Sequence, residues 1–80
     1  MNTITQLHNE LTKRDLLVKK RIKRCQYLKD RADCMARIGN LEQAEAYAVR
    51  LELHKLKLIE LIEEIERIEQ RIEKLSKLKS

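Results

Sequence analysis

The most constraining feature of this sequence is a heptad repeat of apolar residues in its second half. Between residues 51 and 75, Leu and Ile recur in alternating steps of three and four. The first apolar heptad position is held by Leu51, Leu58, Ile65 and Ile72, and the second by Leu61, Ile68 and Leu75. This spacing is typical of a coiled-coil helix whose apolar seam packs against another helix. Because such a helix is marginal alone in water, the rest of the chain is expected to cover the seam.

The composition favours long helices throughout the 80 residues. The chain contains one Gly, no Pro and two Tyr as its only aromatic residues, whereas 42% of the residues are hydrophobic and 39% are charged. Gly and Pro are the residues that most often interrupt helices, while Leu, Glu, Lys and Arg are good helix formers. A chain of this size forms one domain. We therefore predict an all-α fold with a single domain over residues 1–80.

A second apolar stripe runs through the first half of the chain. Its members, at near-helical spacing, are Ile4, Leu7, Leu11, Val18, Ile22, Cys25, Leu28, Ala32 and Met35. The only Gly, Gly39, follows this stripe and precedes Asn40. Gly commonly ends a helix, and Asn commonly caps the start of the next. The sequence predicts one helix over residues 3–38, a turn at residues 39–40 and a second helix over residues 41–77.

The two stripes match each other when the chain reverses at this turn. Residues equally distant from the turn then face each other, so that Leu28 meets Leu51 and most other apolar positions also meet apolar ones. Such agreement between the local pattern and the overall arrangement predicts an antiparallel helical hairpin. Arg14 and Arg21 interrupt the first stripe. We expect their stems to lie on apolar surface, with Glu64 and Glu66 as acceptors for their charge.

Several large apolar residues lie outside the two stripes. The candidate residues for a partner or oligomer interface are Leu16, Tyr27, Val49, Leu53, Leu56, Ile59 and Ile62. A large apolar patch left in water is typical of an interaction site. The simplest way to cover it is a homodimer of hairpins that forms a four-helix bundle, although a higher helical oligomer such as a tetramer also fits the pattern.

The charge of the chain is unevenly distributed. Residues 1–40 contain ten Lys and Arg against four acids, residues 41–80 contain eight against nine, and the net charge is +5. The basic residues of the first helix that could contact nucleic acid are Lys13, Lys20, Lys23, Arg24 and Arg31. Such a row can follow a phosphate backbone. Alternatively, these cations form ion pairs with the Glu residues at 60–66, which the register places opposite them.

The sequence contains no motif for catalysis. It has no Gly-rich phosphate loop, no nucleophile motif and no cluster of metal ligands. Cys25 and His54 fall in one layer of the predicted seam, where two copies could surround a zinc ion, but small core residues and register-setting polar residues are commoner in such layers. We predict no catalytic residues, no metal site and no cofactor. The two Cys, the absence of an apolar leader and the lack of a membrane-spanning segment favour a cytoplasmic location without membrane contact.

These features predict a small non-enzymatic module for protein binding. It would act as a regulator, inhibitor or assembly adaptor that binds a partner protein through a helix face, and it would also bind itself. The alternative is a nucleic-acid-binding helical dimer that uses the basic face of the first helix. The chemical identity of the partner is not encoded in any motif of the chain.

Overall fold

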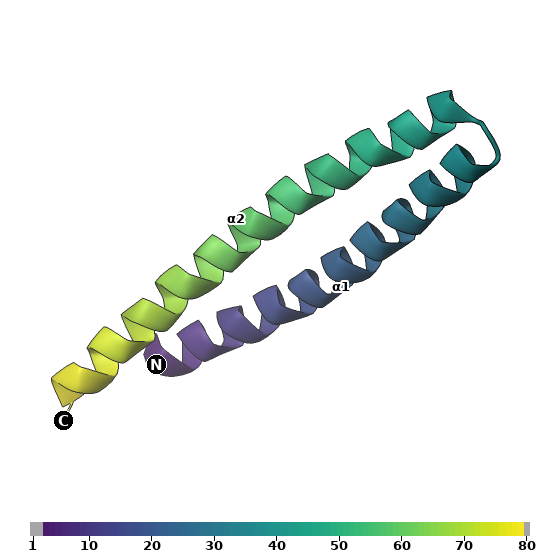
Figure 1. Ribbon diagram of the computed structural model, residues 1–80. Helices are drawn as coiled ribbons and strands as arrows, with labels where there is room; N and C mark the ends of the chain where they lie inside the picture. Colours follow the sequence, from purple (N-terminus) through teal and green to yellow (C-terminus); the bar gives the residue numbers. More distant parts are fainter. Residues whose placement is uncertain (1–2, 80) are drawn as a thin grey trace.

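A computed structural model describes residues 3–79, which form an antiparallel helical hairpin (Figure 1). Helix α1 spans Thr3–Arg37 and helix α2 spans Leu41–Lys79. The helices pack against each other and form a rod with dimensions of 61 × 15 × 14 Å. No strand occurs within the described range. The helical hairpin predicted from the two matching stripes is thereby confirmed, with α1 ending one residue earlier and α2 two residues later than predicted.

The connection at residues 38–40 ends α1 and starts α2 through backbone and side-chain hydrogen bonds. Gly39 has a positive φ of 84°, in the left-handed region that favours Gly. The N–H of Gly39 donates to the carbonyl of Ala36 at 3.1 Å, and the N–H of Asn40 donates to that of Met35 at 2.8 Å. Asn40 Oδ1 accepts a hydrogen bond from the N–H of Gln43 at 3.2 Å. The expected Gly stop and Asn cap are therefore present.

The seam between the helices consists of side chains that are partly withdrawn from water. In α1 they are Ile4, Leu7, Leu11, Arg14, Val18, Arg21, Cys25, Leu28, Ala32 and Met35. In α2 they are Ala44, Tyr47, Leu51, His54, Leu58, Leu61, Ile65, Ile68, Ile72 and Leu75. Both sets follow the steps of three and four of a coiled coil. Among the described residues only Leu7 and Leu28 are buried, with 6% and 1% of their surface exposed, so the hairpin has a very small core.

Ile22 lies outside the seam, and its assignment to the apolar stripe is wrong. Its side chain is 43% exposed, whereas Arg21 beside it is half-buried. The seam position after Val18 is three residues further along the heptad, which is position 21, where Arg21 was expected to interrupt the stripe, so Ile22 was counted in the stripe in addition to the true seam position. A charged residue therefore occupies a seam position that an apolar residue would normally fill.

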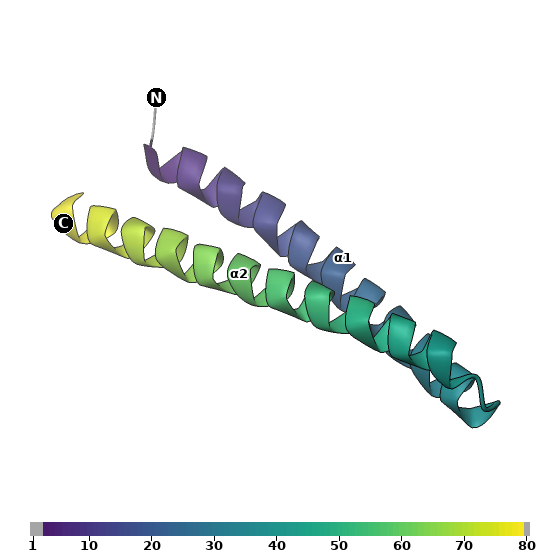
Figure 2. The ribbon, with the colours of Figure 1, turned by 90° about the horizontal axis from the view of Figure 1, so that it is seen from above.

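The two helices wind around each other. When the rod is viewed at right angles to Figure 1, α1 and α2 cross near the turn and separate towards the other end (Figure 2). Such winding keeps a heptad seam facing its partner helix. It leaves each helix with an outer side that points away from the hairpin.

Candidate interaction surfaces

Large apolar side chains are exposed on the outer side of α2. Val49, Leu53, Leu56 and Ile59 are 52–58% exposed, and Ile62 is 43% exposed. Steps of three and four residues place them on successive turns outside the seam, and the repeated steps of three make the row wind around α2, so that Ile62 lies on nearly the opposite side of the helix from Leu53. We call these five residues the outer stripe of α2. All five were among the candidate interface residues.

The two candidate interface residues of α1 are eleven residues, or about three helical turns, apart on the side of α1 that faces away from α2. Leu16 is 56% exposed and is two residues from the seam positions on either side, so it points away from α2. Tyr27 is 49% exposed, and the Arg24 guanidinium lies over its ring at 5.2 Å from the ring centre. The structure therefore does not bring Leu16 together with the outer stripe of α2.

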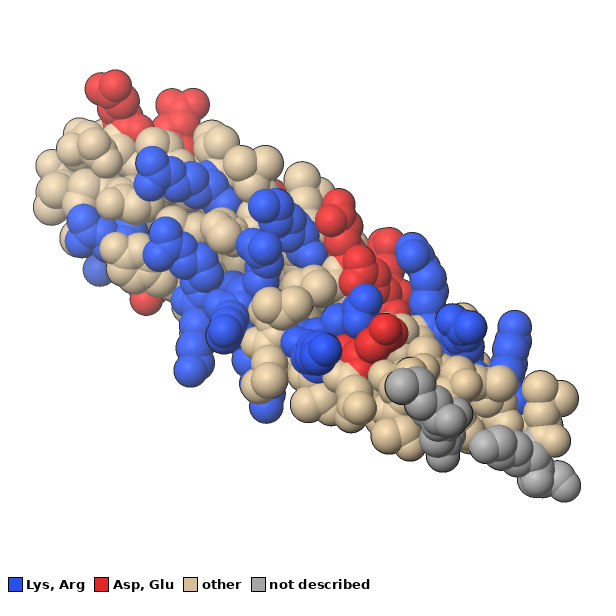
Figure 3. Space-filling model, turned by 180° about the vertical axis from the view of Figure 1, so that it is seen from behind, with Lys and Arg blue, Asp and Glu red and all other residues tan. Residues whose placement is uncertain are grey.

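A basic groove runs between the two helices along one flank. It consists of two hollows that share His54. One is lined by Leu17, Lys20, Arg21 and Arg24 of α1 together with His54, and the other by Arg50, Leu53, His54 and Lys57 of α2. On the face seen in Figure 3, Lys and Arg side chains crowd the half of the rod that is nearer the turn. The hollow continues past Lys57 to Glu60 and Glu64. The cationic section therefore has a defined end, where carboxylates begin.

The cations of the basic groove have no carboxylate partner in residues 3–79. The described ion pair between the helices joins Arg14 Nε to Glu64 Oε2 at 3.0 Å. Other ion pairs join residues of the same helix, such as Arg67 and Glu63 at 3.8 Å. The expectation that Arg14 reaches Glu64 is confirmed. Among the described residues, the cations of the basic groove do not pair with the Glu residues at 60–66.

The five candidate nucleic-acid contacts on α1 also lack a carboxylate partner among the described residues. In the part of the chain that the structure describes, none of them takes part in an ion pair; they are Lys13, Lys20, Lys23, Arg24 and Arg31. Lys20 and Arg24 line the basic groove, where Arg50 and Lys57 of α2 join them. These two α2 residues were missed because the candidate contacts were chosen by spacing along one helix, and the register between the helices was applied only to the seam and to the Glu residues at 60–66.

Arg21 and His54 form a polar contact at the floor of the basic groove. Arg21 Nη1 lies 2.8 Å from His54 Nδ1. Because a guanidinium can only donate, His54 accepts at Nδ1 and carries its proton on Nε2. Partial burial lowers the pKa of His54, and the nearby charges of Arg21, Arg24 and Lys57 lower it further. His54 is therefore neutral at pH 7. Arg21 was expected to reach a Glu, and this expectation is wrong.

Tyr47 is enclosed by guanidinium groups from both helices. Arg31 of α1 lies 5.6 Å and Arg50 of α2 lies 5.8 Å from the centre of the ring. Tyr47 raises the pKa of Arg31, so this guanidinium stays charged. Arg31 Nε is buried and has no hydrogen-bond partner among the described residues. These cation–π contacts connect the helices near the turn and hold two positive charges close together.

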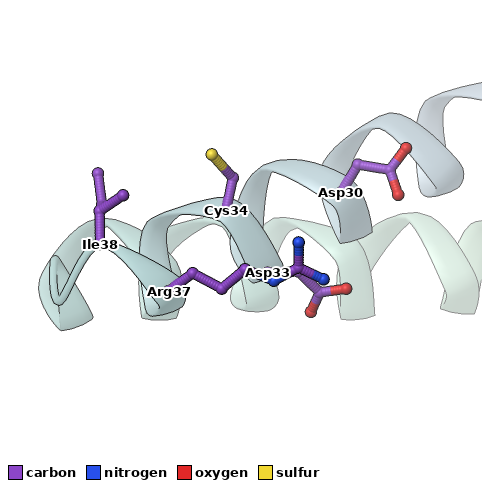
Figure 4. Close-up of a pocket in the computed structure, with 5 residues that line it drawn as sticks. All are labelled: Asp30, Asp33, Cys34, Arg37 and Ile38. Atoms are coloured by element: carbon purple, nitrogen blue, oxygen red, sulfur yellow. The ribbon is translucent and has the colours of Figure 1, made fainter.

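A shallow hollow lies on α1 near the turn. It is lined by Asp30, Asp33, Cys34, Arg37 and Ile38. Figure 4 shows that the side chains of Cys34 and Ile38 point in the same direction from the end of α1. Neither Cys25 nor Cys34 is in a disulfide, and Cys34 is the exposed one. Within residues 3–79, no group of three or more His, Cys, Asp or Glu side chains is arranged to hold a metal ion.

The described helices also lack a segment that is long and apolar enough to cross a membrane. The sequence matches no protein-family model and has no significant match among the curated proteins or the solved structures. The hairpin itself offers two kinds of recognition. The outer stripe of α2 can be covered by apolar surface, and the basic groove can be neutralised by an anionic group.

Proposed function

We propose that this chain is a small non-enzymatic protein-interaction module that acts as a homodimer. The observation that carries the proposal is the exposure of Val49, Leu53 and Leu56, at 55–58%, in a hairpin with only two buried side chains among its described residues. A contiguous apolar stripe of this kind is typical of a protein interface. Covering it with a second hairpin would create the core that a single hairpin lacks.

A second copy is the occupant that best matches the outer stripe. An antiparallel pairing of two α2 helices about a twofold axis near Leu56 would place Leu53 of one copy opposite Ile59 of the other. The stripe is thus complementary to itself, as an isologous interface requires. The resulting four-helix bundle would present further helix faces to a partner protein, as a regulator, an inhibitor or an assembly adaptor does.

The test is the double substitution Val49→Asp and Leu56→Asp. Neither residue belongs to the seam, so the hairpin is expected to keep its helix content. A fully buried Val or Leu stabilises an interface by about 1.5–3 kcal/mol, so the dissociation constant of the dimer should rise by more than about tenfold. Light scattering after size-exclusion chromatography should give twice the chain mass of 9.6 kDa for the wild type and a value approaching 9.6 kDa for the variant.

The matched control is Leu78→Asp, which changes an α2 leucine that is 82% exposed and lies outside the stripe. This variant should keep the wild-type mass. A wild-type chain that has the mass of a single copy would contradict the proposal. So would a double variant that keeps the wild-type mass.

Nucleic-acid binding through the basic face of α1 is the second candidate function. It is supported by the absence of acidic partners for Lys20, Lys23 and Arg24 within the described residues. A protein that neutralises many phosphates loses affinity by orders of magnitude between about 50 and about 200 mM salt. Tight, salt-sensitive binding of nucleic acid by the wild-type chain would favour this function over the first.

A further inference from the structure

We propose that the basic groove binds an acidic amphipathic helix of a partner protein. Carboxylates of this helix would pair with the cations on both walls, and its Leu or Ile side chains would pack against Leu17 and Leu53. The proposal rests on the proposed function as a protein-interaction module, and it adds a second surface and a partner of defined chemistry. The outer stripe of α2 and the basic groove share Leu53, so a second copy that covers the stripe and a peptide that contacts Leu53 would compete for this side chain.

Charge is the first reason. Five cations surround the groove without a carboxylate partner in the described chain; they are Lys20, Arg21, Arg24, Arg50 and Lys57. His54 between them is kept neutral by partial burial and by its cationic neighbours. Charges of one sign lining a cleft create a strong local potential that attracts a ligand of the opposite sign. An anionic partner would relieve the mutual repulsion of these side chains.

The apolar walls distinguish a peptide helix from a phosphate backbone. Leu17 on α1 is 47% exposed and Leu53 on α2 is 56% exposed. An amphipathic helix that lies in the groove would bury both side chains, because it presents an apolar stripe beside its charged residues. The sugar–phosphate backbone has no comparable apolar face. Nucleic acid would therefore satisfy the cations but leave the leucines exposed.

The length of the cationic section gives the third reason. On α2 it extends from Arg50 to Lys57, which is about 11 Å or two helical turns. Glu60 and Glu64 then line the hollow. A long polyanion that followed the groove would meet these carboxylates, whereas a short helix can place acidic residues beside the cations and a basic residue beside Glu60. The groove would therefore bind a helix that is acidic at one end and basic at the other, and it would bind this helix in a single orientation.

The experiment measures binding of labelled peptides by fluorescence anisotropy. The probes are a panel of synthetic amphipathic helices that carry Leu at helical spacing and Glu on both sides of the Leu stripe. One comparison peptide has Lys in place of Glu, and another has the same composition in a scrambled order that destroys the stripe. A short duplex DNA and a single-stranded DNA complete the set. At least one acidic amphipathic peptide should bind more tightly than both comparison peptides and both DNAs.

Two charge-reversal variants locate the site. Arg24→Glu with Arg50→Glu reverses one cation on each wall, and it should weaken peptide binding by about tenfold or more because attraction is replaced by repulsion. Lys19→Glu with Lys29→Glu changes the net charge equally at exposed residues that do not line the groove, and it should retain most of the affinity. Circular dichroism checks that both variants keep the helix content of the wild type.

Three results would overturn the proposal. DNA could bind more tightly than every acidic peptide, both charge-reversal variants could lose affinity equally, or no acidic peptide could bind better than its scrambled form. The variant with Val49→Asp and Leu56→Asp separates this proposal from the dimer. Neither of these residues lines the groove, and loss of the dimer would leave Leu53 uncovered, so peptide binding should persist or become tighter in it. These measurements therefore distinguish a chain that does not dimerise from a groove that does not bind the peptide.

Discussion

At the scale of single residues, the polar members of the seam are its most informative part. Arg14 reaches Glu64 at 3.0 Å, and Arg21 reaches His54 at 2.8 Å. Apolar residues of similar size at these positions would contribute more to stability, but polar seam residues disfavour other registers because a shifted register would separate them from their partners. The two arginines therefore help to specify how α1 and α2 are aligned.

The contact between Arg21 and His54 predicts that stability falls in mild acid. In the folded chain the pKa of His54 is lowered from its ordinary value near 6.5, so the unfolded chain takes up a proton on this side chain before the folded chain does. The free energy of unfolding should therefore decrease as the pH falls below about 6.5, until the pH drops below the folded pKa. Thermal unfolding followed by circular dichroism at pH 7 and pH 5.5, at one protein concentration, measures this change.

The control for this prediction is His54→Gln. Glutamine can accept the hydrogen bond from Arg21 through its amide oxygen and does not titrate in this range. The difference in melting temperature between the two pH values should be smaller in the variant. If the melting temperature changes equally between the two pH values in the wild type and in the variant, His54 does not cause the pH dependence.

At the scale of helices, the turn decides where α1 ends and where α2 begins. Gly39 adopts a left-handed conformation, and a Cβ atom built on it meets no atom within 4 Å. The requirement for Gly is therefore conformational and does not come from crowding by neighbouring side chains. Asn40 Oδ1 then satisfies one of the first backbone donors of α2.

Gly39→Ala should destabilise the hairpin by about 1–2 kcal/mol, which is the cost of a left-handed conformation for a residue with a Cβ. Gly39→Asn should cost less, because Asn tolerates this conformation better than Ala does. Urea unfolding curves at a fixed protein concentration give the comparison. If the Ala variant unfolds at the same urea concentration as the wild type, the turn does not limit the stability of the hairpin.

At the scale of the whole molecule, a rod 61 Å long and 15 Å wide has too little interior for a substantial core. Two side chains among the described residues are buried, and twelve large apolar ones remain exposed. Chains of this size are marginally stable unless a disulfide, a metal ion or association adds to their core. Cys25 and Cys34 are not joined in a disulfide, and the proposed association would enlarge the core.

If association stabilises the hairpin, its melting temperature must depend on protein concentration. Mass action favours the associated, folded state as the concentration rises, so the midpoint should increase over a hundredfold range of concentration. The variant with Val49→Asp and Leu56→Asp should show a lower midpoint that changes little over the same range. A wild-type midpoint that is independent of concentration would indicate a hairpin that is stable as a single chain.

The sequence by itself determined the two helices, the turn and their antiparallel register. Heptad spacing and the single Gly are local signals, and Gly39 with Asn40 was placed correctly from them. The candidate residues on α2 were also identifiable, because Val49 and Leu56 are apolar but fall outside the seam. Arg21 was correctly identified as an interruption of the first stripe, but Ile22 was wrongly added to that stripe because it is apolar and adjacent, although the heptad count excludes it.

Only the tertiary structure decided which side chains from different helices come together. The basic groove combines Arg24 of α1 with Arg50 of α2, and no spacing along one helix relates these residues. The hydrogen bond from Arg21 to His54 depends on the directions in which two side chains leave their helices. Likewise, Leu16 carries the same apolar signal as Leu56 but lies on the opposite side of the rod. Periodicity shows which face of a helix a residue occupies, whereas packing decides what that face meets.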